Sequence, residues 1–135
     1  MKITVGITAY NCENYLADAI QSVIDQNTNN WLGILVLDGG SNRDTTKIFQ
    51  NFNHPNFKKF AFEKNQGPYS TRSKAIELSD TDWYIQLDGD DLLPQGSLKS
   101  IEISILENPK AEFIYGDCEN FSKNQTYIKY PSSDK

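Results

Sequence analysis

Three carboxylates lie within four residues at Asp88–Asp91, directly after the hydrophobic stretch 83–87. Carboxylates that meet at the end of a strand repel one another, and each raises the pKa of its neighbours. A divalent cation removes this repulsion, and Mg²⁺ or Mn²⁺ typically binds one or two carboxylates together with substrate phosphates. If the backbone stays extended, Asp88 and Asp90 share a face, which predicts a metal site there. The alternative interpretation is an acidic turn before a helix, whose dipole favours negative charge.

Three further side chains have the chemistry to bind a nucleotide. Asp38 ends an apolar run and can accept a hydrogen bond from a base or a sugar hydroxyl, although a turn aspartate before two glycines is an equal alternative. Tyr10 offers a flat face on which a base can stack, but a single aromatic residue at a strand end is more often part of the core. Arg72 can meet a phosphate or a base, and a solvated arginine is the alternative.

The hydrophobic pattern predicts strands and helices that alternate along the chain. Apolar alternation or continuous apolar runs indicate strands over 2–8, 34–37, 59–62, 83–87 and 112–115, and residues 126–130 are compatible with one more. Apolar residues at helical spacing indicate helices over 13–26, 41–52, 70–78 and 94–106. Ser41 and Asp44 form the capping pair of the second helix, and Pro94 lies in the first turn of the last one.

This order of elements predicts an α/β fold with a mostly parallel sheet flanked by helices on both faces. In such sheets, ligands bind beyond the carboxyl ends of the strands. The unusual polar stretches 8–11, 38–41 and 88–91 follow the first, second and fourth predicted strands, as a binding site requires. Asp91 leads toward the helix at Pro94 and is expected to stabilise it through the helix dipole.

Composition excludes several classes of function. The 135 residues carry 13 Lys and Arg against 18 Asp and Glu, a net charge of −5, which argues against a nucleic-acid partner. Two cysteines and no long apolar run lead us to expect a reduced, cytoplasmic protein, and peripheral attachment to the inner face of the membrane stays open. The sequence contains no dinucleotide fingerprint, phosphate loop or nucleophile elbow.

With these motifs placed, residues 3 to about 117 resemble the family 2 glycosyltransferases of the GT-A fold. The matching stretches are Thr8–Asn11, Tyr15–Leu16, Ser22–Gln26, Val36–Ser41, Asn65–Gly67, Arg72 and Leu87–Asp91. Each motif is weak by itself, but the order and spacing of the set are specific. The chain departs from the family pattern in lacking the proline that usually precedes the tyrosine and asparagine of the first motif.

The resemblance implies a nucleotide-activated sugar as donor, with UDP favoured as the carrier, and Mg²⁺ or Mn²⁺ as the usual cofactor. It assigns the nucleotide to five residues, namely Thr8, Tyr10, Asp38, Arg72 and Asp88, and the metal to Asp90 with Asp88. The sugar would pass with inversion to an acceptor glycan or lipid-linked sugar. Family members carry the catalytic base in an acceptor-binding half. We therefore expect residues 1–135 to form a single nucleotide-sugar-binding domain that lacks this half and is inactive alone.

Two alternatives remain at this point. A strand that ends in Asp-x-Asp is also typical of haloacid-dehalogenase-like phosphatases, in which Asp88 would be the phosphorylated nucleophile. Against this, the motif follows the fourth predicted strand rather than the first, and Leu92 stands where Thr or Val is usual. The other alternative is a nucleotide-binding module without catalytic activity.

Overall fold

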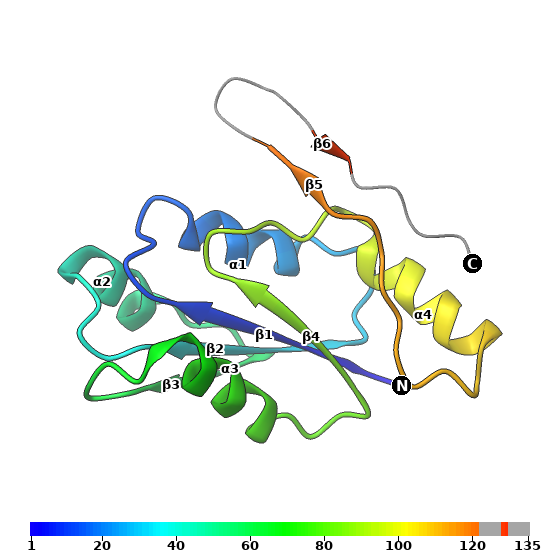
Figure 1. The fold of residues 1–135 in the computed structure, drawn as a ribbon, viewed down its shortest axis with the longest axis horizontal. Coiled ribbons are helices and arrows are strands. Elements are labelled where there is room, and N and C mark those ends of the chain that lie inside the picture. Colours follow the sequence, from blue (N-terminus) through cyan, green and yellow to red (C-terminus); the bar gives the residue numbers. More distant parts are fainter. Residues whose placement is uncertain (122–127, 130–135) are drawn as a thin grey trace. The chain divides into compact units, whose positions relative to one another are not determined.

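The computed structural model describes residues 1–121 and 128–129, and the chain divides into two compact units, Met1–Ser100 and Ile101–Lys135. The first unit contains a four-stranded parallel sheet in the order β3-β2-β1-β4 (Figure 1). Its strands are β1 (Ile3–Ala9), β2 (Trp31–Leu37), β3 (Phe57–Ala61) and β4 (Trp83–Asp88). β1 and β2 are almost wholly buried, as central strands of a parallel sheet should be.

Three helices connect these strands, namely α1 (Leu16–Ile24), α2 (Arg43–Asn51) and α3 (Gly67–Glu77). α1 and α2 carry the chain from β1 to β2 and on to β3, whereas α3 returns it past β2 and β1 to β4. Because such crossovers are right-handed, α1 and α2 cover one face and α3 covers the other (Figure 1). The predicted parallel sheet with helices on both faces is therefore confirmed.

The two faces of β1 bury different kinds of side chain. Ile3, Val5 and Ile7 are fully buried on the face toward α1. The other face carries a polar row, in which the strand register pairs Gly6 with Gln86 and Thr8 with Asp88 of β4. On the α3 face of the neighbouring strand β2, an apolar cluster of Ile34, Val36 and Ala75 closes the core.

α4 (Ser97–Glu107) starts later than the sequence predicts. Pro94 lies before the helix, not in its first turn. The reason is the buried carboxamide of Gln26, which donates to the Leu93 and Pro94 carbonyl oxygens at 3.2 and 2.9 Å and accepts from the Leu98 N–H at 3.1 Å. These contacts hold the segment in an irregular path, and Gly96 completes it with a φ of 85°.

The starts of α2 and α1 also differ from the prediction. Helix α2 is capped by Asn42, whose side chain accepts from the Thr45 N–H at 2.9 Å, and not by the predicted pair Ser41 and Asp44. The predicted helix over 13–26 is shorter, because an irregular turn over 10–15 precedes Leu16.

In the second unit, the predicted strand over 112–115 is wrong. Phe113 and Tyr115 of this irregular stretch are exposed, and their rings stack with their centroids 6.2 Å apart. The short strands β5 (Glu119–Asn120) and β6 (Ile128–Lys129) instead form an antiparallel pair. β6 falls within the predicted strand 126–130, of which residues 126, 127 and 130 lie outside the described part. None of the described helices is long and apolar enough to cross a membrane.

Candidate active site

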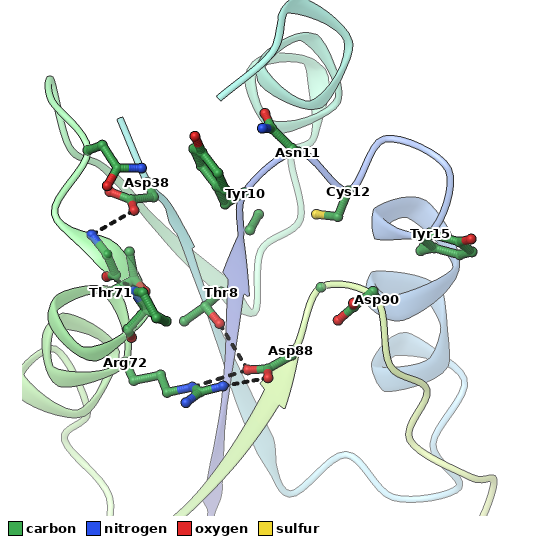
Figure 2. Close-up of a pocket in the computed structure, with 15 residues that line it drawn as sticks. Thr8, Tyr10, Asn11, Cys12, Tyr15, Asp38, Thr71, Arg72, Asp88 and Asp90 are labelled. Carbon is green, nitrogen blue, oxygen red and sulfur yellow. Dashed lines mark hydrogen bonds and ion pairs between the residues drawn. The ribbon is translucent and has the colours of Figure 1, made fainter. Parts of the chain in front are cut away.

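The strand order creates a switch point between β1 and β4, since the chain leaves β1 in one direction toward β2 and later returns on its other side to β4. Open α/β sheets bind their ligands at such a point, outside the carboxyl ends of the strands. A cavity of about 440 Å³ lies there (Figure 2). It is lined by residues 8–12, Tyr15, Asp38, Asn65, 67–68, 71–72 and 88–90.

The structure brings every residue of the predicted site to the wall of this one cavity. They come from the end of β1, the loops after β1 and β2, helix α3, and the end of β4 with its following turn, and they are Thr8, Tyr10, Asp38, Arg72, Asp88 and Asp90. Cys12, Asn65 and Thr71 were not predicted as site residues. Asn65 was visible as part of the Asn65–Gly67 motif, whereas nothing in the sequence singled out Thr71.

Asp88 is held by an ion pair with Arg72. Arg72 Nη2 lies 2.6 Å from Oδ2 of Asp88, and Nε donates to Oδ1 at 3.2 Å (Figure 2). The Thr8 hydroxyl donates to the same Oδ1 at 3.2 Å. The hydrogen bonds and the negative charge of Asp88 raise the pKa of the Arg72 guanidinium above its ordinary value. The Asp88 charge is thus compensated by a side chain that is itself 45% exposed and free to turn toward a ligand.

Asp90 contrasts with Asp88, because its exposed carboxylate reaches the cavity without a partner. Among residues 1–121, no hydrogen bond or ion pair engages this carboxylate. A turn places it, since the Asp91 N–H donates to the Asp88 carbonyl at 3.0 Å and the Gly89 N–H donates to the Thr8 carbonyl at 2.8 Å. Asp88 and Asp90 both line the cavity, but the predicted extended backbone is wrong.

Gly89 is required in this turn. A Cβ at this position would lie 2.8 Å from the Thr8 carbonyl oxygen and 2.9 Å from Sγ of Cys12. Only glycine therefore lets the turn pack against the end of β1. Burial raises the pKa of the Cys12 thiol beneath it, and the negative charge of Asp90 adds to this rise, although a backbone hydrogen bond lowers the pKa. The thiol is therefore protonated at neutral pH.

These carboxylates fit a divalent cation that also binds the ligand. In the described part of the chain, no cluster of three or more His, Cys, Asp or Glu side chains offers a cage for a metal ion. The cavity instead presents the unpartnered Asp90 and the exchangeable pair of Asp88 with Arg72. Mg²⁺ and Mn²⁺ usually bind one or two carboxylates and take their other ligands from phosphate and water, so this donor set suits them.

Asp91 lies outside the cavity lining and does not have the predicted role. Helix α4 begins only at Ser97, so the Asp91 carboxylate cannot stabilise its first turn. Partial desolvation raises the pKa of the Asp91 carboxyl, and the charges of Asp90 and Asp88 raise it further. Asp91 is therefore a source of repulsion in the folded chain at neutral pH, rather than a helix-stabilising group.

Asp38 joins two loops of the site. Its side chain is only 3% exposed, and its oxygens accept hydrogen bonds from the backbone N–H groups of Gly39 at 2.9 Å, Gln66 at 2.8 Å and Gly67 at 2.9 Å. This carboxylate thus fixes the start of α3, from which Arg72 projects. Oδ2 accepts from the Gly67 N–H alone among the described residues, so it can accept one more hydrogen bond from a ligand.

Tyr10 stands in a loop that α2 holds in place. Asn11 has a φ of 46°, and its side chain accepts from the Asn42 N–H at 2.7 Å, while the Cys12 N–H donates to the fully buried Thr45 hydroxyl at 2.9 Å. These contacts leave the Tyr10 ring 48% exposed at the cavity. The alternative that Tyr10 is a core residue is therefore wrong, and the ring is open to stacking.

The segment after the turn that carries Asp90 is supported from α1 and the residues directly after it. Ser22 accepts from the Leu93 N–H at 3.0 Å, and Gln26 makes the contacts to Leu93, Pro94 and Leu98 described above. Both residues belong to the stretch Ser22–Gln26, which the sequence singled out only by resemblance. Its structural purpose is to hold the segment that follows the acidic turn.

Comparison with known proteins agrees with this architecture. The sequence profile described as Glycosyl transferase family 2 matches residues 4–133. Among solved structures, TarS 1-349 of S. aureus in complex with UDP-GlcNAc superposes with a TM-score of 0.73 at 26% identity, over 81% of this chain and 32% of that one. This likeness confirms the GT-A type of fold.

Two curated relatives are similar to the chain. A chondroitin synthase of Escherichia coli is 34% identical over 93 residues, which cover 67% of this chain and 13% of the relative. The E. coli enzyme named UDP-Glc:alpha-D-GlcNAc-diphosphoundecaprenol beta-1,3-glucosyltransferase WfgD is 26% identical over 133 residues, or 98% of this chain and 52% of that protein. The profile covers nearly the whole chain and overturns the phosphatase alternative: the chain belongs to glycosyl transferase family 2.

Proposed function

We propose that the cavity between β1 and β4 binds the nucleotide diphosphate of an activated sugar, with UDP as the carrier. The observation that carries this proposal is the unpartnered Asp90 carboxylate beside the exchangeable pair of Asp88 and Arg72, in a cavity that also presents Tyr10 and Asp38. Its support from relatives is the UDP-GlcNAc complex of TarS and the UDP-glucose named for WfgD.

Each side chain has a task that its surroundings allow. The exposed Tyr10 ring stacks on the base, and the remaining acceptor position on Asp38 Oδ2 takes a hydrogen bond from it. Arg72 turns from Asp88 toward the diphosphate, a planar donor meeting phosphate oxygens. The Thr8 hydroxyl donates to Asp88, so Thr8 also acts on the nucleotide through that carboxylate.

Asp90, together with Asp88, would hold Mg²⁺ or Mn²⁺. When bound, the cation neutralises negative charge on the diphosphate leaving group. The chain's own contribution is to bring both carboxylates to the cavity, where Arg72 and Thr8 hold Asp88 and the turn at Gly89 places Asp90.

The whole protein would transfer the sugar to an acceptor hydroxyl with inversion. The hydroxyl oxygen forms the new bond at the anomeric carbon, the bond to the diphosphate breaks, and a base outside the described cavity takes the hydroxyl proton. We assign no catalytic base to this chain. The chain spans 13% and 52% of the two curated relatives described above. That residues 1–135 form a single nucleotide-sugar-binding domain therefore stays a prediction. A lipid-linked sugar acceptor, as named for WfgD, would place the protein at the inner face of the membrane.

Ligand preference tests the proposal. With Mn²⁺ present, UDP or a UDP-sugar is expected to raise the melting temperature of the chain, and NAD is not, because no dinucleotide fingerprint follows β1. A ligand at 100 times its Kd stabilises the folded state by about 2.7 kcal/mol. Differential scanning fluorimetry with UDP, GDP, dTDP and NAD measures the shifts. No shift with any of the first three nucleotides would contradict the proposal.

A further inference from the structure

A row of polar side chains runs along the α3 side of β1 and β4 and ends at Asp88. Successive side chains of a strand alternate between its faces, so Tyr84, Gln86 and Asp88 share one side of β4. Tyr84 and Gln86 are absent from the cavity lining, and neither belongs to the predicted site. Their contacts nevertheless lead directly to the Asp88 carboxylate.

Gln86 acts on one oxygen of Asp88. Its Nε2 lies within hydrogen-bond distance of three acceptors: Oδ1 of Asp88 at 3.3 Å, the Thr8 hydroxyl at 3.2 Å and the Leu87 carbonyl oxygen at 3.2 Å. The Thr8 hydroxyl donates to the same Oδ1. With Nε of Arg72, three donors therefore converge on Oδ1. In the described part of the chain, Oδ2 accepts only from Arg72. When Arg72 turns away, Thr8 and Gln86 still hold Oδ1, and Oδ2 is open.

Tyr84 sets the orientation of the Gln86 amide. Its hydroxyl donates to Oε1 of Gln86 at 2.7 Å, which forces Nε2 to face Thr8 and Asp88. Burial raises the pKa of Tyr84 to about 12, so the hydroxyl remains a donor at physiological pH. The end of the Tyr84 ring fits over Gly6 of β1, where a Cβ would overlap the Tyr84 hydroxyl.

We propose that Gln86, oriented by Tyr84, is a positioning residue that fixes Oδ1 of Asp88 and presents Oδ2 to the donor nucleotide. This inference rests on the proposed function of the cavity. It assigns the two oxygens of one carboxylate different tasks, one structural and one toward the ligand. It also gives Gly6 a role in binding at a distance, through the room it leaves for Tyr84.

Calorimetric titration of UDP with Mn²⁺ tests the effect on binding. Gln86→Met keeps the length of the side chain and removes the amide, and we expect UDP affinity to fall about tenfold, as for loss of a hydrogen bond to a charged group. Gln21→Met is the matched control, since it removes an exposed 2.7 Å hydrogen bond to Asp25 away from this cavity, and it should bind UDP like the wild type. Tyr84→Phe should weaken binding less than Gln86→Met, and it should have no effect in the Gln86→Met background.

Urea unfolding without ligand tests the interaction of Gln86 with Asp88 separately from nucleotide binding. A double-mutant cycle of Gln86→Met and Asp88→Ala should show coupling of about threefold or more in the unfolding constant. Absent coupling, or wild-type UDP affinity in a folded Gln86→Met chain, would overturn the positioning role. If Tyr84→Phe lowers UDP affinity equally in the wild-type and Gln86→Met chains, Tyr84 does not act through Gln86. If the cycle shows coupling but the wild-type chain does not bind UDP, the proposed function is overturned and the link between Gln86 and Asp88 is retained.

Discussion

Asp90→Asn is expected to abolish the Mn²⁺ dependence of UDP binding while the fold stays intact. Asparagine has nearly the same shape as aspartate but no charge, and no hydrogen bond within residues 1–121 depends on this carboxylate. The affinity of the UDP-bound chain for Mn²⁺ should fall by about 100-fold or more, since loss of even an outer-shell partner costs a metal site about 10- to 100-fold. Calorimetric titration of UDP with Mn²⁺ and with EDTA measures the change.

Asp91→Asn is the matched control, because Asp91 belongs to the same acidic turn but lies outside the cavity lining. It should keep the Mn²⁺ dependence. The raised pKa of Asp91 means that its contribution to stability is present while the carboxyl is protonated and is lost as the pH rises through that raised value. Asp91→Asn should therefore stabilise the chain at pH 7 and have little effect at pH 3. Loss of Mn²⁺-dependent binding in Asp91→Asn, with binding kept in Asp90→Asn, would reverse the assignment.

Asp38→Ala is expected to reduce both stability and nucleotide binding. From the sequence alone, Asp38 either accepts a hydrogen bond from a base or a sugar hydroxyl, or belongs to a turn before two glycines. In the structure it also satisfies the backbone N–H groups of Gly39, Gln66 and Gly67. A buried donor left unsatisfied costs about 1–3 kcal/mol, so removing this shared acceptor should lower the free energy of unfolding by about 3 kcal/mol or more. Urea unfolding measures this loss.

The matched variant Asp38→Asn keeps one carbonyl oxygen in place of the carboxylate. It should retain part of the lost stability, since that oxygen can still accept from the loop before α3. Nucleotide affinity should fall in both variants, by about 1–3 kcal/mol for the charged hydrogen bond. A folded Asp38→Ala chain with wild-type stability would show that the loop is held by other contacts. Wild-type UDP affinity in that chain would remove Asp38 from the binding site.

The sheet and the members of the site were predictable because their signals are local. Continuous apolar runs revealed the buried strands, and polar residues directly after them revealed the cavity wall, since the carboxyl ends of parallel strands meet at one edge. Tyr10, Asp38 and Asp88 could be chosen in this way without knowledge of the strand order.

What could not be predicted depends on partners far along the chain. The start of α4 is set by Gln26, which contacts Pro94 and Leu98 across the fold. Asp38 has a structural role because it accepts hydrogen bonds from backbone N–H groups of the loop before α3. Nearly every residue has such a donor, so no sequence pattern identifies the ones that bind Asp38. Helix propensity and turn patterns reflect only residues that are close in the sequence. They therefore placed Pro94 in a helix and predicted that Asp91 stabilises the start of that helix.

The central claim is that the cavity between β1 and β4 is the nucleotide-sugar site, and nuclear magnetic resonance of the ¹⁵N-labelled chain tests it most directly. With UDP and Mg²⁺, amide signals of Gly39, Gly67 and Gly89 should shift, and replacing Mg²⁺ by Mn²⁺ should broaden those of Gly89–Asp91 most. A second cavity of about 710 Å³ between α1 and α2, lined by Ile20 and Ile48, provides the contrast. Shifts confined to that groove, or no shifts with saturating UDP and metal, would contradict the account.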